Sequence, residues 1–164
     1  MIKRIILAIM IALPMSLFAQ KFGVINTQQL VESMPEFKSV NEQMDAVTKK
    51  YEDEYAKLRE EFQKKYEEFQ SLDASTLQTI KDRRMQEMQE LDQKIQQFQA
   101  TAAQDIQRQQ QQLMAPIQEK VIQAIQSVGT EGAYTFIFEN AVPIYVGKDV
   151  TDVTDAVKAR LGVK

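Results

Sequence analysis

The sequence predicts an α+β fold that is mostly α, with a small β-rich oligomerisation head and a long antiparallel coiled-coil hairpin of helices. Two observations predict this fold. Residues 36–128 contain no glycine and carry apolar side chains at helical spacing over most of their length. Residues 129–164 hold four of the five glycines and most clusters of β-branched and aromatic residues. A hairpin in the middle brings the two strand-forming ends together in one head.

The composition restricts the chemistry that the chain could perform. Its 164 residues carry a net charge of −3 and include no Cys, His or Trp. Thiol and imidazole catalysis and most zinc sites are thereby excluded. The scattered glycines form no phosphate-binding loop, and an acidic chain is not typical of a nucleic-acid binder. We therefore expect no catalytic residue, no metal, no cofactor and no nucleic-acid partner.

Residues 1–19 have the layout of a secretory signal peptide. Lys3 and Arg4 precede an apolar run over residues 5–18, and the small residue Ala19 precedes Gln20. The run contains Pro14 and is short for a membrane-spanning helix, which needs about 20 apolar residues. The sequence predicts export, with cleavage after Ala19.

The head is expected to contain three short strands and two short helices. Residues 22–26 read as a strand, with Asn26 or Thr27 capping a helix that Pro35 stops. Residues 134–138 and 144–146 are expected to pair as a hairpin, to which the first strand could add. A last helix over residues 153–161 would be capped by Asp152 and ended by Gly162.

The arm is predicted from one continuous apolar stripe. From Phe37 to Phe69 the apolar residues recur every three or four positions, which is typical of one helix roughly 50 Å long. Residues 71–75 interrupt the stripe, and Ser75 with Gln78 fits a capping box that would start a second helix near Thr76. Two long helices joined by so short a link must fold back as an antiparallel hairpin.

These elements predict a head of residues 20–35 and 116–164 and an arm of residues 36–115, with its tip near residues 71–75. Pro116 removes an amide and should kink the second helix near Gln112, so Pro35 and Pro116 are candidate hinges where the arm meets the head. A head of roughly 60 residues is small for its apolar content, so we expect heads to associate. The candidate oligomerisation residues are Phe22, Val24, Phe136, Ile137, Phe138 and Tyr145.

The sequence resembles the periplasmic Skp (OmpH-like) chaperones of Gram-negative envelopes. The resemblance rests on the signal peptide, the opening residues 22–27, the helical hairpin, the run over residues 138–150 and the final helix. It implies a homotrimer whose arms surround a cavity, and ATP-independent holding of unfolded outer-membrane proteins. Family members are often basic, whereas this chain is acidic. A paired-arginine pattern for lipopolysaccharide would fall near Arg108, which four glutamines follow, so lipopolysaccharide or membrane-surface contact is doubtful.

Three classes of function are candidates for this sequence. A periplasmic holdase chaperone fits the exposed arm, because many weak contacts could hold an aggregation-prone chain and release it without ATP. The alternative is a structural coiled-coil envelope protein without chaperone activity. An enzyme is disfavoured, because acid pairs such as Glu60 and Glu61 fall on solvated helix faces.

Overall fold

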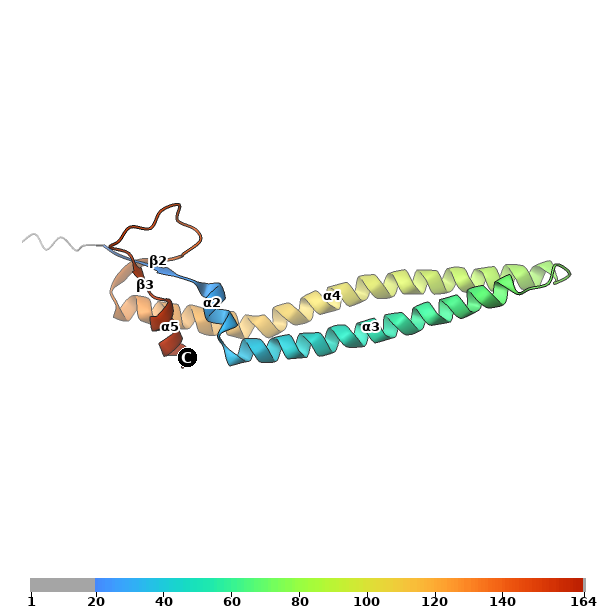
Figure 1. Cartoon of the computed structure of the whole chain (residues 1–164), viewed down its shortest axis with the longest axis horizontal. Helices are drawn as coiled ribbons and strands as arrows, with labels where there is room; N and C mark the ends of the chain where they lie inside the picture. Colours follow the sequence, from blue (N-terminus) through green and yellow to red (C-terminus); the bar gives the residue numbers. More distant parts are fainter. Residues whose placement is uncertain (1–19, 164) are drawn as a thin grey trace, which may run out of the picture. The chain divides into compact units, whose positions relative to one another are not determined.

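The computed structural model describes residues 20–163, so the predicted signal peptide lies outside the described range (Figure 1). The described elements are, in chain order, β1 (Lys21–Ile25), α2 (Thr27–Glu32), α3 (Pro35–Gln70), α4 (Gln78–Glu131), β2 (Tyr134–Glu139), β3 (Thr151–Asp152) and α5 (Thr154–Leu161). Helices dominate and the strands are few and short, which confirms the predicted fold class. In this range no helix has both the length and the apolar character needed to cross a membrane.

The contacts divide the described chain into two compact units. The head comprises residues 20–30 and 123–162, and the arm comprises residues 31–122. The helix α4 contributes to both, because its last nine residues, 123–131, belong to the head. The contact-based boundaries leave a longer arm than the one expected from Pro35 and Pro116.

The head is built around a three-stranded parallel sheet in the order β2-β1-β3. The central strand β1 pairs with β2 from Lys21 opposite Tyr134 to Ile25 opposite Glu139, and with β3 at Gly23 and Val24. Behind the sheet, Leu30, Val153 and Val157 are at most 1% exposed. The head therefore closes its core with segments that are more than 100 residues apart in the sequence.

The predicted hairpin between residues 134–138 and 144–146 is wrong. Residues 144–146 form no strand, and the third strand is instead β3, which runs parallel to β1. Ile144 is fully exposed and Tyr145 is 84% exposed. A high strand propensity shows only that a residue would fit a half-buried pleated surface. It does not show that the segment pairs with another strand, and residues 144–146 lie on a loop.

Short polar contacts fix the helices of the head to the sheet. Asn26 Oδ1 accepts a hydrogen bond from the Gln29 amide at 2.9 Å, so Asn26 caps α2 as expected. The buried hydroxyl of Thr154 accepts a bond from the Asn26 amide at 3.0 Å. The last helix starts one residue later than predicted, at Thr154, whose amide donates to Asp152 Oδ1 at 2.8 Å. It ends at Gly162, which has the left-handed conformation expected of a C-cap (φ 72°).

The arm is an antiparallel pair of long helices packed through one apolar seam (Figure 1). Its tightest cluster joins Leu58 of α3 to Leu91 and Ile95 of α4, and Tyr55, Phe62 and Phe98 pack around it. Further along, the Tyr51 ring lies 5.9 Å from that of Phe98, and its hydroxyl donates to Asp105 Oδ2 at 3.0 Å. The predicted stripe therefore forms the contact between the helices in this part of the arm.

The tip differs from the prediction. Ser75 does not cap α4, because its amide and hydroxyl both donate to Asp73 Oδ1, at 2.8 and 2.7 Å. Asp73 offers Ser75 a partner two residues away, and such local turns compete with helix caps. The side chain of Gln78 bonds Asp82 instead, and α4 begins at Gln78. Leu77, Ile80 and Met85 are 69%, 43% and 44% exposed, so the seam does not extend to the tip.

Candidate functional site

One face of the head sheet carries a cluster of exposed aromatic side chains. Phe136 and Phe138 of β2 are 56% and 42% exposed, and their rings lie 5.7 Å apart. Phe22 of β1 stacks on Phe136 at 6.2 Å, with the two planes within 5° of parallel. Alternate residues of a strand share a face, so β1 and β2 together present a continuous apolar surface.

The loop over residues 142–150 extends this surface, and a hollow lies between the loop and the strands. An apolar hollow of about 260 Å³ lies within the head. It is lined by Phe22, Val24, Phe138, Val142, Pro143, Tyr145, Val146 and Val150. Five of the six predicted oligomerisation residues lie in or beside it. We call this surface the head face.

Ile137 lies on the other side of the sheet. A Cβ atom on Gly23 would lie 3.2 Å from Ile137 Cγ1, and one on Gly129 of α4 would lie 3.5 Å from Ile137 Cδ1. Ile137 therefore packs against the glycines of β1 and α4. The strand alternation separates it from its neighbours Phe136 and Phe138, and it is not part of the head face.

The two prolines occupy different positions in their helices. Pro35 is the first residue of α3, where its missing amide costs nothing. Pro116 lies inside α4, which stays helical on both sides of it. A hollow of about 250 Å³ in the arm is lined by Pro116, Val40 and Ile117, and beside it Lys120 donates to Glu36 at 2.8 Å. That the two prolines act as hinges remains a prediction.

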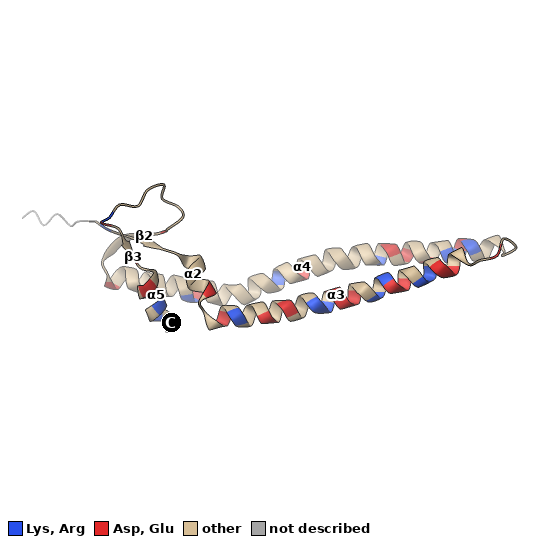
Figure 2. Ribbon diagram, viewed as in Figure 1, with Lys and Arg blue, Asp and Glu red and all other residues tan. Residues whose placement is uncertain are grey.

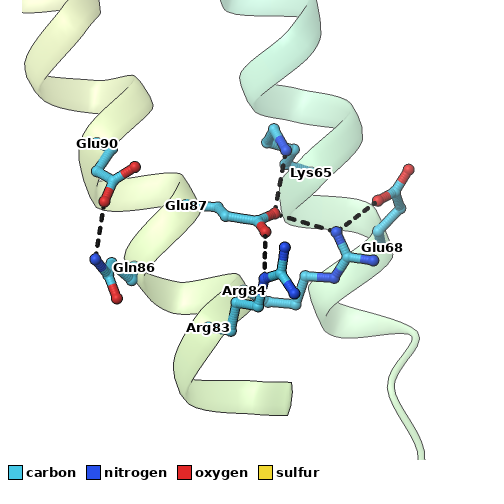
Figure 3. Close-up of polar contacts among 7 residues, drawn as sticks. All are labelled: Lys65, Glu68, Arg83, Arg84, Gln86, Glu87 and Glu90. Carbon is cyan, nitrogen blue, oxygen red and sulfur yellow. Dashed lines mark hydrogen bonds and ion pairs between the residues drawn. The ribbon is translucent and has the colours of Figure 1, made fainter. Parts of the chain in front are cut away.

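Near the tip of the arm, one carboxylate gathers three cations (Figure 3). Glu87 of α4 accepts from Lys65 of α3 at 3.3 Å, from Arg83 at 3.2 Å and from Arg84 at 3.1 Å. Arg84 also lies 4.0 Å from Glu68 of α3. We call this group the tip clamp, because Lys65 and Arg84 connect the two helices through it.

The tip clamp holds Glu87 in its charged form. The hydrogen bond from Lys65, followed by the contact with Arg84, lowers the pKa of Glu87 below its ordinary value of 4.5. The spacing of Arg83 and Glu87 is visible in the sequence as a helical i,i+4 pair. The contribution of Lys65 was missed, because it depends on the register of the hairpin.

The sequence predicts no catalytic and no metal-binding residue. Over residues 20–163 there is no group of three or more Asp and Glu side chains placed to hold a metal ion. The surfaces that the described chain does provide are the head face, the tip clamp and the exposed sides of the two arm helices.

A small parallel sheet and a long antiparallel helical hairpin in one chain define a class of arm-bearing protein. The chain belongs to the outer membrane protein (OmpH-like) family, whose model matches residues 21–161. Its fold is similar to a crystal structure from Caulobacter crescentus CB15, described as a proposed outer membrane chaperone (OmpH-like). The TM-score is 0.74 at 14% identity, over 87% of this chain and 83% of the other. No curated protein was found to match the sequence.

Proposed function

We propose that the protein is an ATP-independent holdase chaperone of the periplasm. It binds unfolded outer-membrane β-barrel proteins in a space between the arms of a homotrimer. The observation that carries this proposal is the arm itself. The 36-residue helix α3 packs through a single seam against the part of the 54-residue helix α4 that belongs to the arm, and most of the remaining surface of both is exposed.

An arm of this kind suits weak and distributed binding. Unfolded β-barrel chains expose alternating apolar residues and aggregate in water. A long polar surface can touch such a chain at many places without offering it an apolar groove that would trap it. Release then needs no nucleotide, because no single contact is strong. Membership of the OmpH-like family supports a chaperone role.

The head face supports the proposed assembly. Phe136, Phe138 and Tyr145 leave a large apolar surface open to water in the single chain. Exposed patches of this kind mark sites of association, and the outer edge of β2 has no strand beside it in the described chain. Other copies of the head would cover both features. The resemblance to the trimeric chaperones implies three copies.

The proposal is tested by shortening the arm while keeping its tip and its seam in register. Deleting residues 44–57 and 92–105 removes two heptads from each helix, about 21 Å of arm. Leu58 and Leu91 still face each other, and the tip clamp and the head are untouched. The mature protein should keep a denatured outer-membrane protein soluble after dilution without ATP. The shortened variant should lose most of this protection for large clients and less of it for small ones.

Two controls define the result. Light scattering should give the same number of copies per assembly for both proteins, since the head face is unchanged. Circular dichroism should show that the shortened hairpin is still helical. Equal protection of large and small clients by the shortened assembly would contradict the proposal, and a structural role for the hairpin would then be the better account.

A further inference from the structure

The two arm helices differ in how densely charged residues occur along them (Figure 2). In α3, 17 of the 36 residues are Asp, Glu, Lys or Arg. In the stretch of α4 over residues 93–118 the charged residues are Lys94, Asp105 and Arg108, whereas residues 86–112 include 12 glutamines. In Figure 2 the coloured charges accordingly run along the whole of α3, and the middle of α4 is almost free of them.

The glutamines of α4 form one continuous face. At about 100° per residue, positions spaced by four and three residues fall within about 40° of a common direction. This face lies opposite the seam residues Leu91, Ile95 and Ala102, and all of its members are exposed. We call it the amide face, and it consists of Gln93, Gln97, Ala100, Gln104, Gln107 and Gln111.

The side chains of the amide face have no partner within the arm. In the described part of the chain, no hydrogen bond or ion pair involves the side chains of its five glutamines. Other glutamines of α4 do have partners: Gln78 donates to Asp82, Gln86 to Glu90 and Gln96 to Asp92, at 2.7–2.9 Å. The amide face differs because no acid stands four residues away along it.

The corresponding outward face of α3 is charged throughout most of its length. Lys38, Glu42, Lys49, Asp53, Glu60 and Glu67 follow the same spacing on the side opposite Leu58, and all are exposed. A charged group loses more hydration than a neutral one when a partner covers it. Binding of a partner to the face of α3 would therefore cost more hydration than binding to the face of α4. A partner that is held by weak contacts should bind α4 in preference to α3.

We propose that the amide face of α4 is the surface that contacts the backbone of an unfolded client polypeptide, and that the charged face of α3 turns to solvent. The inference rests on the proposed holdase function. Each glutamine amide offers two N–H donors and a carbonyl acceptor, which match the carbonyl and N–H groups of a peptide bond. Because the face carries no charge, it accepts acidic and basic segments of a client alike.

The chemistry of the face favours a polypeptide over an anionic lipid or nucleic acid. Phosphate recognition uses Arg or Lys, and the amide face includes neither. Stacking of bases needs aromatic side chains, and the aromatic residue of this stretch, Phe98, belongs to the seam. The methyl group of Ala100 and the methylene stems of the glutamines supply the apolar part of the contact.

The first experiment maps the contact in the full assembly. A photo-crosslinking amino acid is placed at Gln97 or Gln104 on the amide face, and at Lys49 or Glu60 on α3 as matched controls. The probe is a denatured outer-membrane β-barrel protein. We expect client crosslinks from the two α4 positions to exceed those from α3 about tenfold, since crosslinking requires direct contact. Equal yields from the two helices, or a higher yield from α3, would overturn the inference.

The second experiment adds equal numbers of positive and negative charges to the amide face, so the net charge of the protein stays the same. Gln93→Glu with Gln97→Lys, and Gln107→Glu with Gln111→Lys, add two ion pairs at helical i,i+4 spacing, so the helix should not lose stability. The control replaces Lys38, Glu42, Lys49 and Asp53 of α3 by Gln. The α4 variant should need about tenfold more protein for the same protection, and the control should protect at least as well as the wild type.

The two proposals fail in different ways. If the wild-type assembly protects no client, the holdase proposal and this inference both fall. If the wild type protects clients but the α4 variant protects them equally well, only the inference is overturned. If lipid vesicles of anionic phospholipid compete with the crosslinks at Gln97, the face recognises a membrane rather than a polypeptide, which also overturns it.

Discussion

The head and the arm bury their apolar side chains in different ways. The head brings together segments from both ends of the chain, and its Leu30, Val153 and Val157 are almost completely buried. The arm buries a narrower seam, with Leu58, Leu91 and Ile95 at 4–6% exposure. Yet the better-packed head leaves Phe136, Phe138 and Tyr145 exposed, whereas the outward sides of the arm are polar.

The exposed surface of the head is therefore apolar, whereas the exposed surface of the arm is polar. An apolar sheet face gains free energy of roughly 25 cal/mol for each Å² that a partner covers, so the head is suited to a lasting contact with other copies. The polar sides of the arm gain little from being covered, so they are suited to contacts that form and break. The comparison predicts that changes in the head alter assembly, whereas changes in the arm alter stability locally.

The largest effect is expected at the head face. Replacing Phe136 and Phe138 by Asp would place two charges on the apolar surface and should convert the assembly into monomers. Light scattering measures the mass directly. The matched control is Thr135→Asp, which adds a charge at another exposed position of the same strand, outside the aromatic cluster. If the double variant keeps the wild-type mass, the head face does not hold the copies together.

An intermediate effect is expected in the seam. Leu58→Ala leaves a cavity beside Leu91 and Ile95 and should lower the free energy of unfolding of the arm by about 2–4 kcal/mol. Urea denaturation at a fixed protein concentration measures the change, because the proposed assembly would also contribute to stability. The control is Leu77→Ala at the exposed tip, expected to cost less than about 0.5 kcal/mol.

The mass of the assembly should not change in either of these two arm variants. A Leu58→Ala protein that dissociates into monomers would show that the arms, and not only the heads, hold the copies together. It would therefore weaken the contrast between a head proposed to assemble and an arm proposed to bind clients.

Local patterns in the sequence were enough to predict the helices. The stripe from Phe37 to Phe69 anticipated α3, and the break at residues 71–75 anticipated the tip, because helical periodicity is set by neighbours in the chain. The strand β2 was also expected from its aromatic and β-branched residues. Their pairing was predicted only in part: the first strand was expected to add to a hairpin of residues 134–138 and 144–146, whereas β1 pairs in parallel with β2 and with β3, more than 100 residues away in the sequence.

The candidate site was only partly accessible to the same reasoning. The excess of aromatic residues in a small head pointed to Phe136 and Phe138, which are indeed exposed. Ile137 was predicted together with them, but the alternation of the strand turns it to the face opposite Phe136 and Phe138. The tip clamp could not be predicted without the register of the hairpin. The exposure of residues 144–146 could not be predicted without knowing which apolar segments the sheet leaves unpaired.

The smallest effect is expected from acid at the tip clamp. The pKa of Glu87 is lowered in the folded arm, chiefly by the hydrogen bond from Lys65. A carboxyl whose folded pKa is lowered stabilises the fold at pH values above its ordinary value of 4.5. That contribution is lost as the pH falls from about 4.5 through the lowered pKa, since protonation removes the charge that Lys65 and Arg84 contact.

Hydrogen exchange of the amides near residues 65–90 is the suitable measurement, because it reports local opening of the tip. Exchange there should speed up as the pH is lowered below about 4.5, after correction for the intrinsic pH dependence of exchange. In Glu87→Gln the tip should open more readily at neutral pH, and the additional loss of stability on acidification should be smaller.

The ion pair between Lys120 and Glu36 provides the matched control, since the pKa of Glu36 is also lowered, mainly by its hydrogen bond from Lys120. Amides around Glu36 should keep their acid response in the Glu87→Gln variant. If the tip of the variant still responded to acid as the wild type does, other carboxylates, such as Glu68 or Asp73, would govern its opening, and protonation of Glu87 would not be the cause.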